Sequence, residues 1–199
     1  MKTRYTLALT LSAAAVLSAA GYGWLKPAMA QQTEDWKPVW TEDGQLQLPT
    51  GYREWVYLGS PLTPNALNGG AAGFPEYHNV YVHPYVYAIY KETKVFPEGT
   101  ILLKELQLTL EAEEEDGSRF EVSGRGFFPG PFNGIDIAVK DSSRFADSQN
   151  WGYFNFGHHA PPYAETAAAA PIEACASCHI DNADEDMVFT RFYAILGAD

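Results

Sequence analysis

The clearest pattern of hydrophobic and polar positions lies mid-chain, where residues 100–110 read TILLKELQLTL. Side chains alternate between the two faces of a strand, so Leu102, Lys104 and Leu106 share one face with the leucines that follow. Lys104 therefore stands among leucines, where an ammonium ion is costly to bury. The pattern predicts a strand whose apolar face carries a single lysine.

Two interpretations of Lys104 are open at this point. In the first, the strand lies at a sheet edge and the side chain reaches water, or the opposite face, with Ile101, Leu103 and Glu105, is the buried one. In the second, Lys104 faces a cofactor, and burial disfavours the ammonium form so that a neutral, nucleophilic amine is available.

Further elements follow from runs of β-branched and aromatic residues and from turn residues. Strands are expected at residues 52–58, 77–82, 118–124, 133–140 and 151–156. A short helix is predicted over residues 84–91, with Pro84 at its first position and His83 directly before it. Residues 164–170 have strong helical propensity, and another short helix is expected to carry the motif near the C-terminus.

Two acidic features interrupt this pattern. Residues 111–116 read EAEEED and precede Gly117, which is typical of a solvated hairpin end with an aromatic loop at residues 126–132 beyond it. Asp136, in contrast, stands between Ile135 and Ile137. A carboxylate in that position is a turn-forming or pairing residue, or a pocket acid.

The first 30 residues have the composition of an export signal. Lys2 and Arg4 precede an apolar run at about residues 7–20, and Ala28-Met29-Ala30 supplies a small-residue cleavage site. The apolar run is short for a membrane span, so we expect cleavage after Ala30, with an uncleaved anchor as the alternative. In either case residues 31–199, a single domain of 169 residues, are expected in the periplasm.

The charge of the chain limits its partners. Removing residues 1–30 takes away Lys2, Arg4 and Lys26 and no acidic residue, so the formal charge falls from −12 to −15. A surface this acidic argues against nucleic acid and against anionic lipid as partners. It favours solubility, and it permits docking of a basic electron-transfer partner.

The candidate chemistry is concentrated in Cys175-Ala176-Ser177-Cys178-His179, which holds the only two cysteines of the chain. The C-x-x-C-H spacing is typical of covalent haem c attachment: each thiol adds to a haem vinyl group, and the histidine becomes an axial ligand of the iron. A structural zinc site needs four ligands, and no second pair is present. A thioredoxin-type dithiol belongs to a βαβ unit, which the sequence does not predict.

The other haem ligand has no evident source. A class I cytochrome c is mostly helical, carries its motif near the N-terminus and supplies a methionine well downstream. After cleavage the only methionine here is Met187, eight residues beyond His179. Surface or capping roles are expected for the remaining histidines, which are His78, His83, His158 and His159. We therefore expect a five-coordinate iron with an open distal position, which permits ligand chemistry.

Five segments in collinear order carry a resemblance to a known family. They are residues 52–65 (YREWVYLGSPLTPN), residues 74–81 (FPEYHNVY), residues 96–100 (FPEGT) running into Lys104-Glu105-Leu106, residues 139–145 (VKDSSRF) and the motif at residues 175–179. Together they resemble the cytochrome P460 family over nearly all of the mature chain.

The resemblance implies an α+β fold, with an antiparallel β-sheet flanked by short helices, and usually a homodimer. It implies one covalent haem c held by Cys175, Cys178 and His179, with an additional cross-link from Lys104 to the porphyrin edge. The family's distal proton acceptor falls on Asp136. The implied activity is oxidation of hydroxylamine to nitrogen oxides.

The chain departs from the family pattern at Pro131, where a glutamate is expected, and at His83, where an aspartate cap is expected. The related β-sheet cytochromes c′ share the fold but bind nitric oxide and other gases, lack the cross-link and cap the iron with phenylalanine. Phe127, Phe128 and Phe132 can supply such a cap. A gas-binding protein is therefore the second candidate, and a simple electron carrier is the third.

Overall fold

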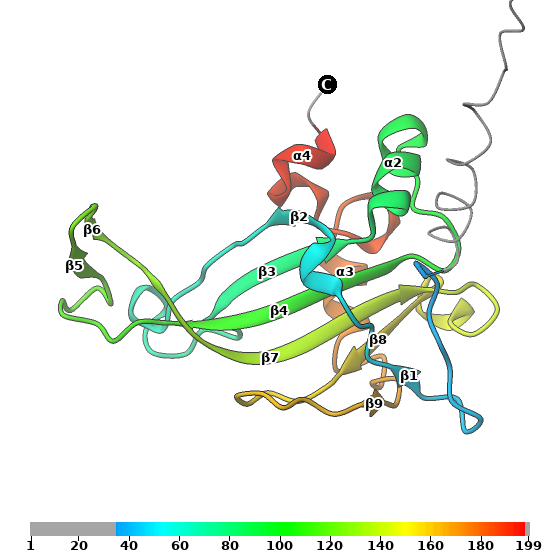
Figure 1. Ribbon diagram of the computed structural model, residues 1–199, viewed down its shortest axis with the longest axis horizontal. Coiled ribbons are helices and arrows are strands. Elements are labelled where there is room, and N and C mark those ends of the chain that lie inside the picture. Colours follow the sequence, from blue (N-terminus) through cyan, green and yellow to red (C-terminus); the bar gives the residue numbers. More distant parts are fainter. Residues whose placement is uncertain (1–34, 198–199) are drawn as a thin grey trace, which may run out of the picture.

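The computed structural model describes residues 35–197, which are built around a five-stranded antiparallel sheet (Figure 1). The export signal expected at residues 1–30 lies outside the described residues. In spatial order the strands are β2 (Val56–Gly59), β3 (Tyr77–Val82), β4 (Ile101–Thr109), β7 (Pro129–Lys140) and β8 (Trp151–Asn155). Together with short helices this is an α+β fold, as expected.

The central strand β4 is buried on both faces, in agreement with its long run of apolar residues. Ile101 and Leu103 are 2% and 0% exposed and pack in one core cluster, whereas Leu102 is 8% exposed and packs in another. The alternation expected for this strand is therefore present. Because both faces are covered, the sheet separates the protein into two layers.

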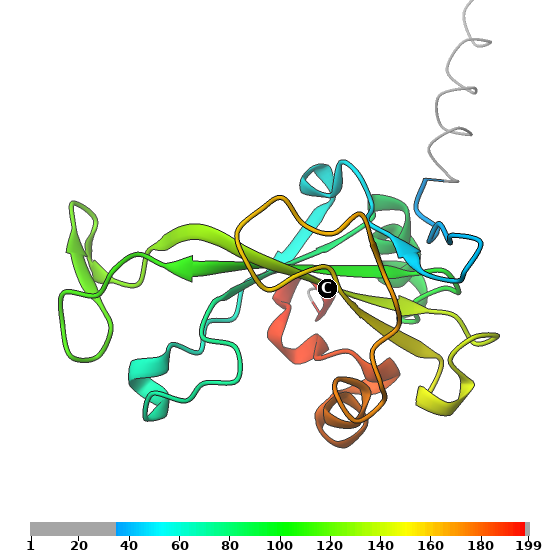
Figure 2. The same ribbon diagram turned by 90° about the horizontal axis from the view of Figure 1, so that it is seen from below.

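Figure 2 shows these layers on either side of the sheet. One face is covered by the C-terminal segment, with α3 (Ala176–Asn182) and α4 (Ala194–Gly197), and by α2 (Pro84–Thr93). The other face is covered by the N-terminal segment, in which β1 (Leu46–Gln47) pairs with β9 (Thr166–Ala167). Among residues 35–197 no helix is both long and apolar enough to cross a membrane.

Within residues 35–197 the connections contain five short 3-10 helices. These are η1 (Tyr52–Glu54), η2 (Asn65–Asn68), η3 (Ala146–Ser148), η4 (Glu185–Met187) and η5 (Thr190–Phe192). The strand expected at residues 52–58 is thus divided into η1 and β2. The strand expected at residues 77–82 coincides with β3.

The acidic hairpin forms an arm that projects from the sheet, as both views show (Figures 1 and 2). Its small sheet pairs β5 (Arg119–Glu121) with β6 (Gly124–Gly126). The single strand expected at residues 118–124 is divided into β5 and the start of β6, and the strand that pairs with β4 is β7. The expected aromatic loop at residues 126–132 is correspondingly shorter, since β7 already begins at Pro129.

The expected helix at residues 164–170 is also absent, and β9 occupies part of that segment. Thr166 and Ala167 pair with β1, and Ala169 forms a bridge with Phe154 of the central sheet. Intrinsic helix propensity is a small free energy per residue even for alanine, the best helix former, so burial and pairing with existing strands outweigh it.

Candidate functional site

The site residues expected from the sequence come from three separate segments. Lys104 lies in β4, Asp136 lies in β7, and Cys175 is the N-cap residue of α3, which contains Cys178 and His179. Positions three and four apart share one side of a helix, so the motif presents its thiols and imidazole together. Both thiols are free; Cys175 is half-buried and Cys178 is exposed.

A backbone hydrogen bond fixes the tautomer of His179. Its Nδ1 lies 2.8 Å from the carbonyl oxygen of Met187, and because a carbonyl only accepts, Nδ1 carries the hydrogen. Burial lowers the pKa of His179 below its usual 6.5, and the charge of Lys104 acts in the same direction, partly offset by the bond to Met187. The imidazole therefore favours its neutral form with Nε2 unprotonated, which is the form that binds a metal.

Aromatic rings enclose the imidazole. The ring centroids of Tyr153 and Phe189 lie 4.6 Å and 4.9 Å from that of His179. The Tyr153 hydroxyl is buried without a hydrogen-bond partner among the described residues, and burial is the main cause that raises the pKa of Tyr153. A buried hydroxyl normally has a partner, so this one marks a place for a polar group next to the imidazole.

Lys104 and Asp136 face each other across β4 and β7. They are register partners, and Lys104 Nζ lies 3.1 Å from Asp136 Oδ2. The other carboxylate oxygen, Oδ1, accepts a 2.7 Å hydrogen bond from Asn155 Nδ2 in β8. Phe74 covers the lysine, with Nζ 3.9 Å from the centroid of its ring. Each side chain of the ion pair is 25% exposed, so the pair is accessible from one side.

This arrangement changes the two interpretations of Lys104. The strand β4 is central, so the edge-strand alternative is wrong. The opposite face is indeed buried, with Leu103 and Glu105 both 0% exposed, but the face of Lys104 is covered as well. The leucines expected around Lys104 are those of its own strand. The neighbouring strand β7 adds Asp136, which pairs with the lysine.

The ion pair lies close enough to the motif for its charges to act there. Burial is the main cause that raises the pKa of Cys175, and the charge of Asp136 raises it further while that of Lys104 lowers it. The same lysine acts on His179. Cys175 and Ala176 also pack in one core cluster with Leu102 and Tyr153 of the sheet. The fold thus brings all five expected residues to one face of the sheet.

These residues fit a covalently held haem. A neutral imidazole with a bare Nε2 suits an axial ligand, and two free thiols one helical turn apart suit thioether formation. The Tyr153 hydroxyl offers a buried polar contact beside them. The amine of Lys104 lies on the same face, where a porphyrin edge needs a nucleophile for a cross-link.

Sequence reasoning missed the polar residues that surround this pair. His78 lies near the ion pair. Burial is the main cause that lowers the pKa of His78, and the charge of Lys104 lowers it further. Glu76 is 2% exposed; its Oε1 lies 2.9 Å from His158 Nε2 and accepts a 2.9 Å hydrogen bond from Asn133. These residues come from separate segments that the fold brings together, so no local sequence motif predicts their contacts.

His83 and Phe132, two residues considered as a ligand and as a cap of the iron, have other contacts in the structure. His83 is the N-cap of α2, as expected, and its Nδ1 accepts a hydrogen bond from the Tyr85 amide. Phe132, one of the expected caps for the iron, packs against the Arg53 guanidinium, which pairs with Glu105 on the opposite face of the sheet. Among the described phenylalanines, Phe74 is the one whose ring covers Lys104.

Comparison with known proteins identifies the family of the chain. The sequence model of the family described as Cytochrome P460 matches residues 49–190, which is most of the chain. A search of curated proteins finds no match. The matched range contains every candidate site residue, from the sheet to the C-x-x-C-H motif.

Proposed function

The chain belongs to the cytochrome P460 family, and from this membership we propose that it is a periplasmic haem oxidoreductase that oxidises hydroxylamine. The family implies a covalently bound c-type haem. The proposed products are nitrogen oxides, and the electrons pass to an external acceptor.

The observation that carries the proposal is the Lys104–Asp136 ion pair, 3.1 Å long, on the sheet face covered by the motif helix. The family's cross-linking lysine and its proton acceptor are expected at these two positions. Their contact places a lysine and an acid together on the face that carries His179. The ammonium becomes a nucleophile once it gives up its proton, and the carboxylate beside it can accept that proton. A simple electron carrier needs neither group.

Each residue then has a distinct role. Cys175 and Cys178 would hold the haem through thioethers, and His179 would bind its iron through Nε2. Lys104 would bond to the porphyrin edge and fix its position. When bound, the haem supplies an iron site that takes up the nitrogenous substrate and its electrons.

Asp136 has the features of a proton acceptor. Oxidation of hydroxylamine removes protons as well as electrons, so a carboxylate beside the substrate site serves as a general base. Asn155 holds one oxygen of Asp136 from β8. That hydrogen bond does not depend on Lys104, so the carboxylate keeps its orientation when the lysine is engaged elsewhere.

One observation favours the second candidate, a gas-binding protein of the cytochrome c′ type. Phe74 lies over Lys104 and is 42% exposed, so a phenylalanine is available near the open side of the site. Such a protein would carry a haem without the lysine bond.

The absorption spectrum separates the two candidates. A lysine bond to the porphyrin edge disturbs its conjugation and shifts the main absorption band far to the red, whereas a gas-binding protein keeps the spectrum of ordinary haem c. Denaturing mass spectrometry should show the mature chain heavier by one haem, and Cys175→Ala with Cys178→Ala should lose it. Wild-type protein without covalent haem, purified from a host that matures cytochromes c, would refute the proposal.

The proposed location and assembly are tested on the same material. We propose that the leader is removed after Ala30 and that the protein works as a periplasmic homodimer with a basic electron acceptor. The N-terminal residue of protein from the periplasmic fraction should then be Gln31. Sedimentation should give twice the mass of the haem-loaded chain.

A further inference from the structure

The turn that follows the motif helix has an unusual backbone. Asp186 has φ 58° and ψ 34°, and Met187 has φ 62°. Both are left-handed conformations, which residues with a side chain seldom adopt. Two in succession persist only where neighbouring groups hold them.

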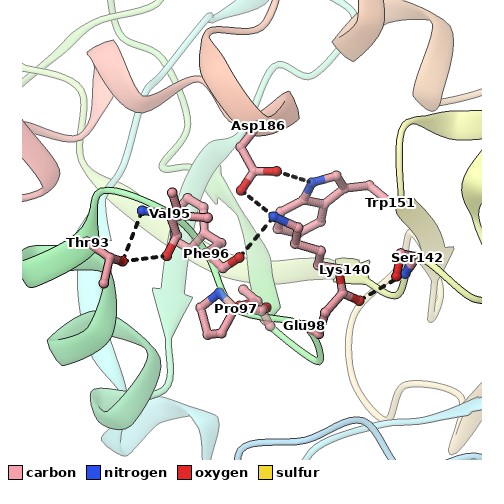
Figure 3. A network of polar contacts seen from close by, with 10 residues as sticks. Thr93, Val95, Phe96, Pro97, Glu98, Lys140, Ser142, Trp151 and Asp186 are labelled. Atoms are coloured by element: carbon pink, nitrogen blue, oxygen red, sulfur yellow. Dashed lines mark hydrogen bonds and ion pairs between the residues drawn. The ribbon is translucent and has the colours of Figure 1, made fainter.

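A buried clamp holds Asp186 in this turn (Figure 3). Lys140 Nζ donates to Asp186 Oδ2 at 2.8 Å, and the indole Nε1 of Trp151 donates to Oδ1 at 3.2 Å. Lys140 also donates to the Phe96 carbonyl at 2.9 Å, which leaves little freedom for its ammonium group. Lys140 and Trp151 are 8% and 1% exposed, so both donors are largely shielded from water.

The clamp is anchored in the sheet. Lys140 ends β7 and Trp151 begins β8, and the two residues are register partners in the antiparallel ladder. The carboxylate of Asp186 therefore binds two donors whose separation is fixed by strand pairing. This ties the turn to the central sheet.

This turn also positions His179, the proposed axial ligand. Met187 directly follows Asp186, and its carbonyl oxygen accepts the Nδ1 hydrogen of His179 at 2.8 Å. Met187 is 5% exposed and packs in the core. Both its side chain and its carbonyl group are therefore held by contacts with other residues. A contact sequence runs from Lys140 and Trp151 through Asp186 to the hydrogen bond on the imidazole.

We propose that Lys140 and Trp151, acting through Asp186, are positioning residues for the haem ligand His179. They hold the Met187 carbonyl against Nδ1 and thereby set the orientation of the ring and its basicity toward iron. A hydrogen bond at the second nitrogen makes a ligating imidazole a stronger donor. The inference rests on haem ligation by His179, part of the proposed function, and does not depend on the substrate.

The test compares Lys140→Met with the wild-type holoprotein. Without the ammonium, the Asp186 carboxylate has one donor left and moves toward water, and the left-handed turn relaxes. The Met187 carbonyl then leaves Nδ1, so the imidazole becomes a weaker donor. We expect the iron–histidine stretching band of the ferrous protein, measured by resonance Raman spectroscopy, to shift to lower frequency. The reduction potential should rise, because a weaker donor stabilises ferric iron less.

Arg53→Met is the matched control. It removes a cation from another ion pair of the sheet, since Arg53 lies 2.6 Å from the buried Glu105 on the opposite face. Both variants lose one positive charge and should lower the melting temperature. Only Lys140→Met should shift the Raman band and the potential. Equal losses of stability with both haem signals unchanged would overturn the inference.

A milder variant covers the case in which Lys140→Met does not fold. Trp151→Phe keeps an aromatic ring in the core and removes the indole N–H that binds Asp186, together with part of the ring volume. It should shift the band in the same direction by a smaller amount, and an unchanged band would count against the clamp. Hydroxylamine oxidation by the wild type is assayed separately. A Raman shift in Lys140→Met, together with a wild type that does not oxidise hydroxylamine, would support the clamp and refute the proposed substrate.

Discussion

Lys104 joins two parts of the site that lie far apart in the sequence. Its ammonium contacts Asp136 on the next strand and the Phe74 ring before β3. An ion pair that is one-quarter exposed contributes little net stability, on the order of 1 kcal/mol or less. Its value for the protein is therefore chemical, because it holds an amine and a carboxylate in contact on the face where the haem is proposed to bind.

We predict that Lys104→Leu separates the cross-link from the rest of haem binding. Asp136 keeps its hydrogen bond from Asn155, and leucine suits the apolar positions on that face, so the variant should fold and retain both thioethers. The red-shifted spectrum should revert to that of ordinary haem c, and hydroxylamine oxidation should be weakened or lost. An unchanged spectrum would show that no cross-link forms and would favour the gas-binding candidate.

Asp136→Ala should give the complementary result. The spectrum should stay red-shifted, because Lys104 is still present, while steady-state oxidation of hydroxylamine should fall by about 10²- to 10⁴-fold if Asp136 is the general base. Glu121→Ala is the control: it removes an exposed carboxylate that pairs with Arg119 on the projecting arm. Full activity in Asp136→Ala would mean that the proton acceptor is a different residue.

The site could be predicted from sequence only where its signals are local or belong to a recognisable family. The C-x-x-C-H motif is local, and Lys104 stands out within its own strand. Asn155 and Phe74 carry no such signal. Asn155 reaches Asp136 through the register of β7 and β8, and Phe74 reaches Lys104 from the loop before β3. The clamp on Asp186 escaped prediction for the same reason.

At the scale of elements, α2 shows how one side chain controls a helix end. His83 Nδ1 accepts a 3.2 Å hydrogen bond from the Tyr85 amide, which requires an unprotonated nitrogen. Burial is the main cause that lowers the pKa of His83 below 6.5, although Asp35 opposes it. Since the unfolded chain binds the proton more readily, this cap stabilises the fold fully above about pH 6.5 and progressively less as the pH falls below that value.

We therefore predict that His83→Asp reduces the acid sensitivity of the protein. Aspartate caps a helix over a wider pH range, so the difference in unfolding free energy between pH 7.5 and pH 5 should be smaller than in the wild type. His83→Ala should lose about 1 kcal/mol at pH 7.5 and show the same reduced pH dependence. Urea unfolding at the two pH values measures both, and an unaltered pH dependence in His83→Asp would contradict the assignment.

Elements with strong local signals were predicted well, and those set by long-range pairing were not. The alternating and aromatic residues of β3 and the Pro84 start of α2 are confirmed. The Ala-rich segment around β9 was expected to be helical, but pairing with β1 extends it. The sequence predicts one strand at residues 118–124, whereas this segment folds back on itself as β5 and β6. Nothing in the sequence shows that residues 111–126 leave the central sheet.

At the scale of the whole molecule, the two layers have separate tasks. The layer with α3 carries the candidate site. On the opposite face of the same strand, Glu105 is buried and pairs with Tyr52 and with the exposed Arg53. The central sheet connects the layers, since β4 supplies Lys104 to one and Glu105 to the other.

The acidity of the chain gives the last prediction. Its formal charge is −12, and removal of the proposed leader, which contains three basic residues and no acidic one, would make it −15. Glu173 and Asp181 are exposed and flank the motif, so they lie where an electron acceptor would approach the haem. Attraction between exposed charges is screened over about 8 Å at physiological salt. Electron transfer to a basic acceptor protein should therefore slow as salt increases, and transfer to an acidic acceptor should not.

The residues responsible can be identified by matched pairs of variants. Glu173→Gln with Asp181→Asn should flatten the dependence of the transfer rate on ionic strength, measured by stopped-flow reduction of the acceptor. Glu111→Gln with Glu115→Gln removes the same charge from two exposed residues between β4 and β5. Because these positions lie away from the motif, that pair should leave the dependence nearly unchanged. Equal flattening by both pairs would mean that net charge alone attracts the acceptor, without docking at the motif.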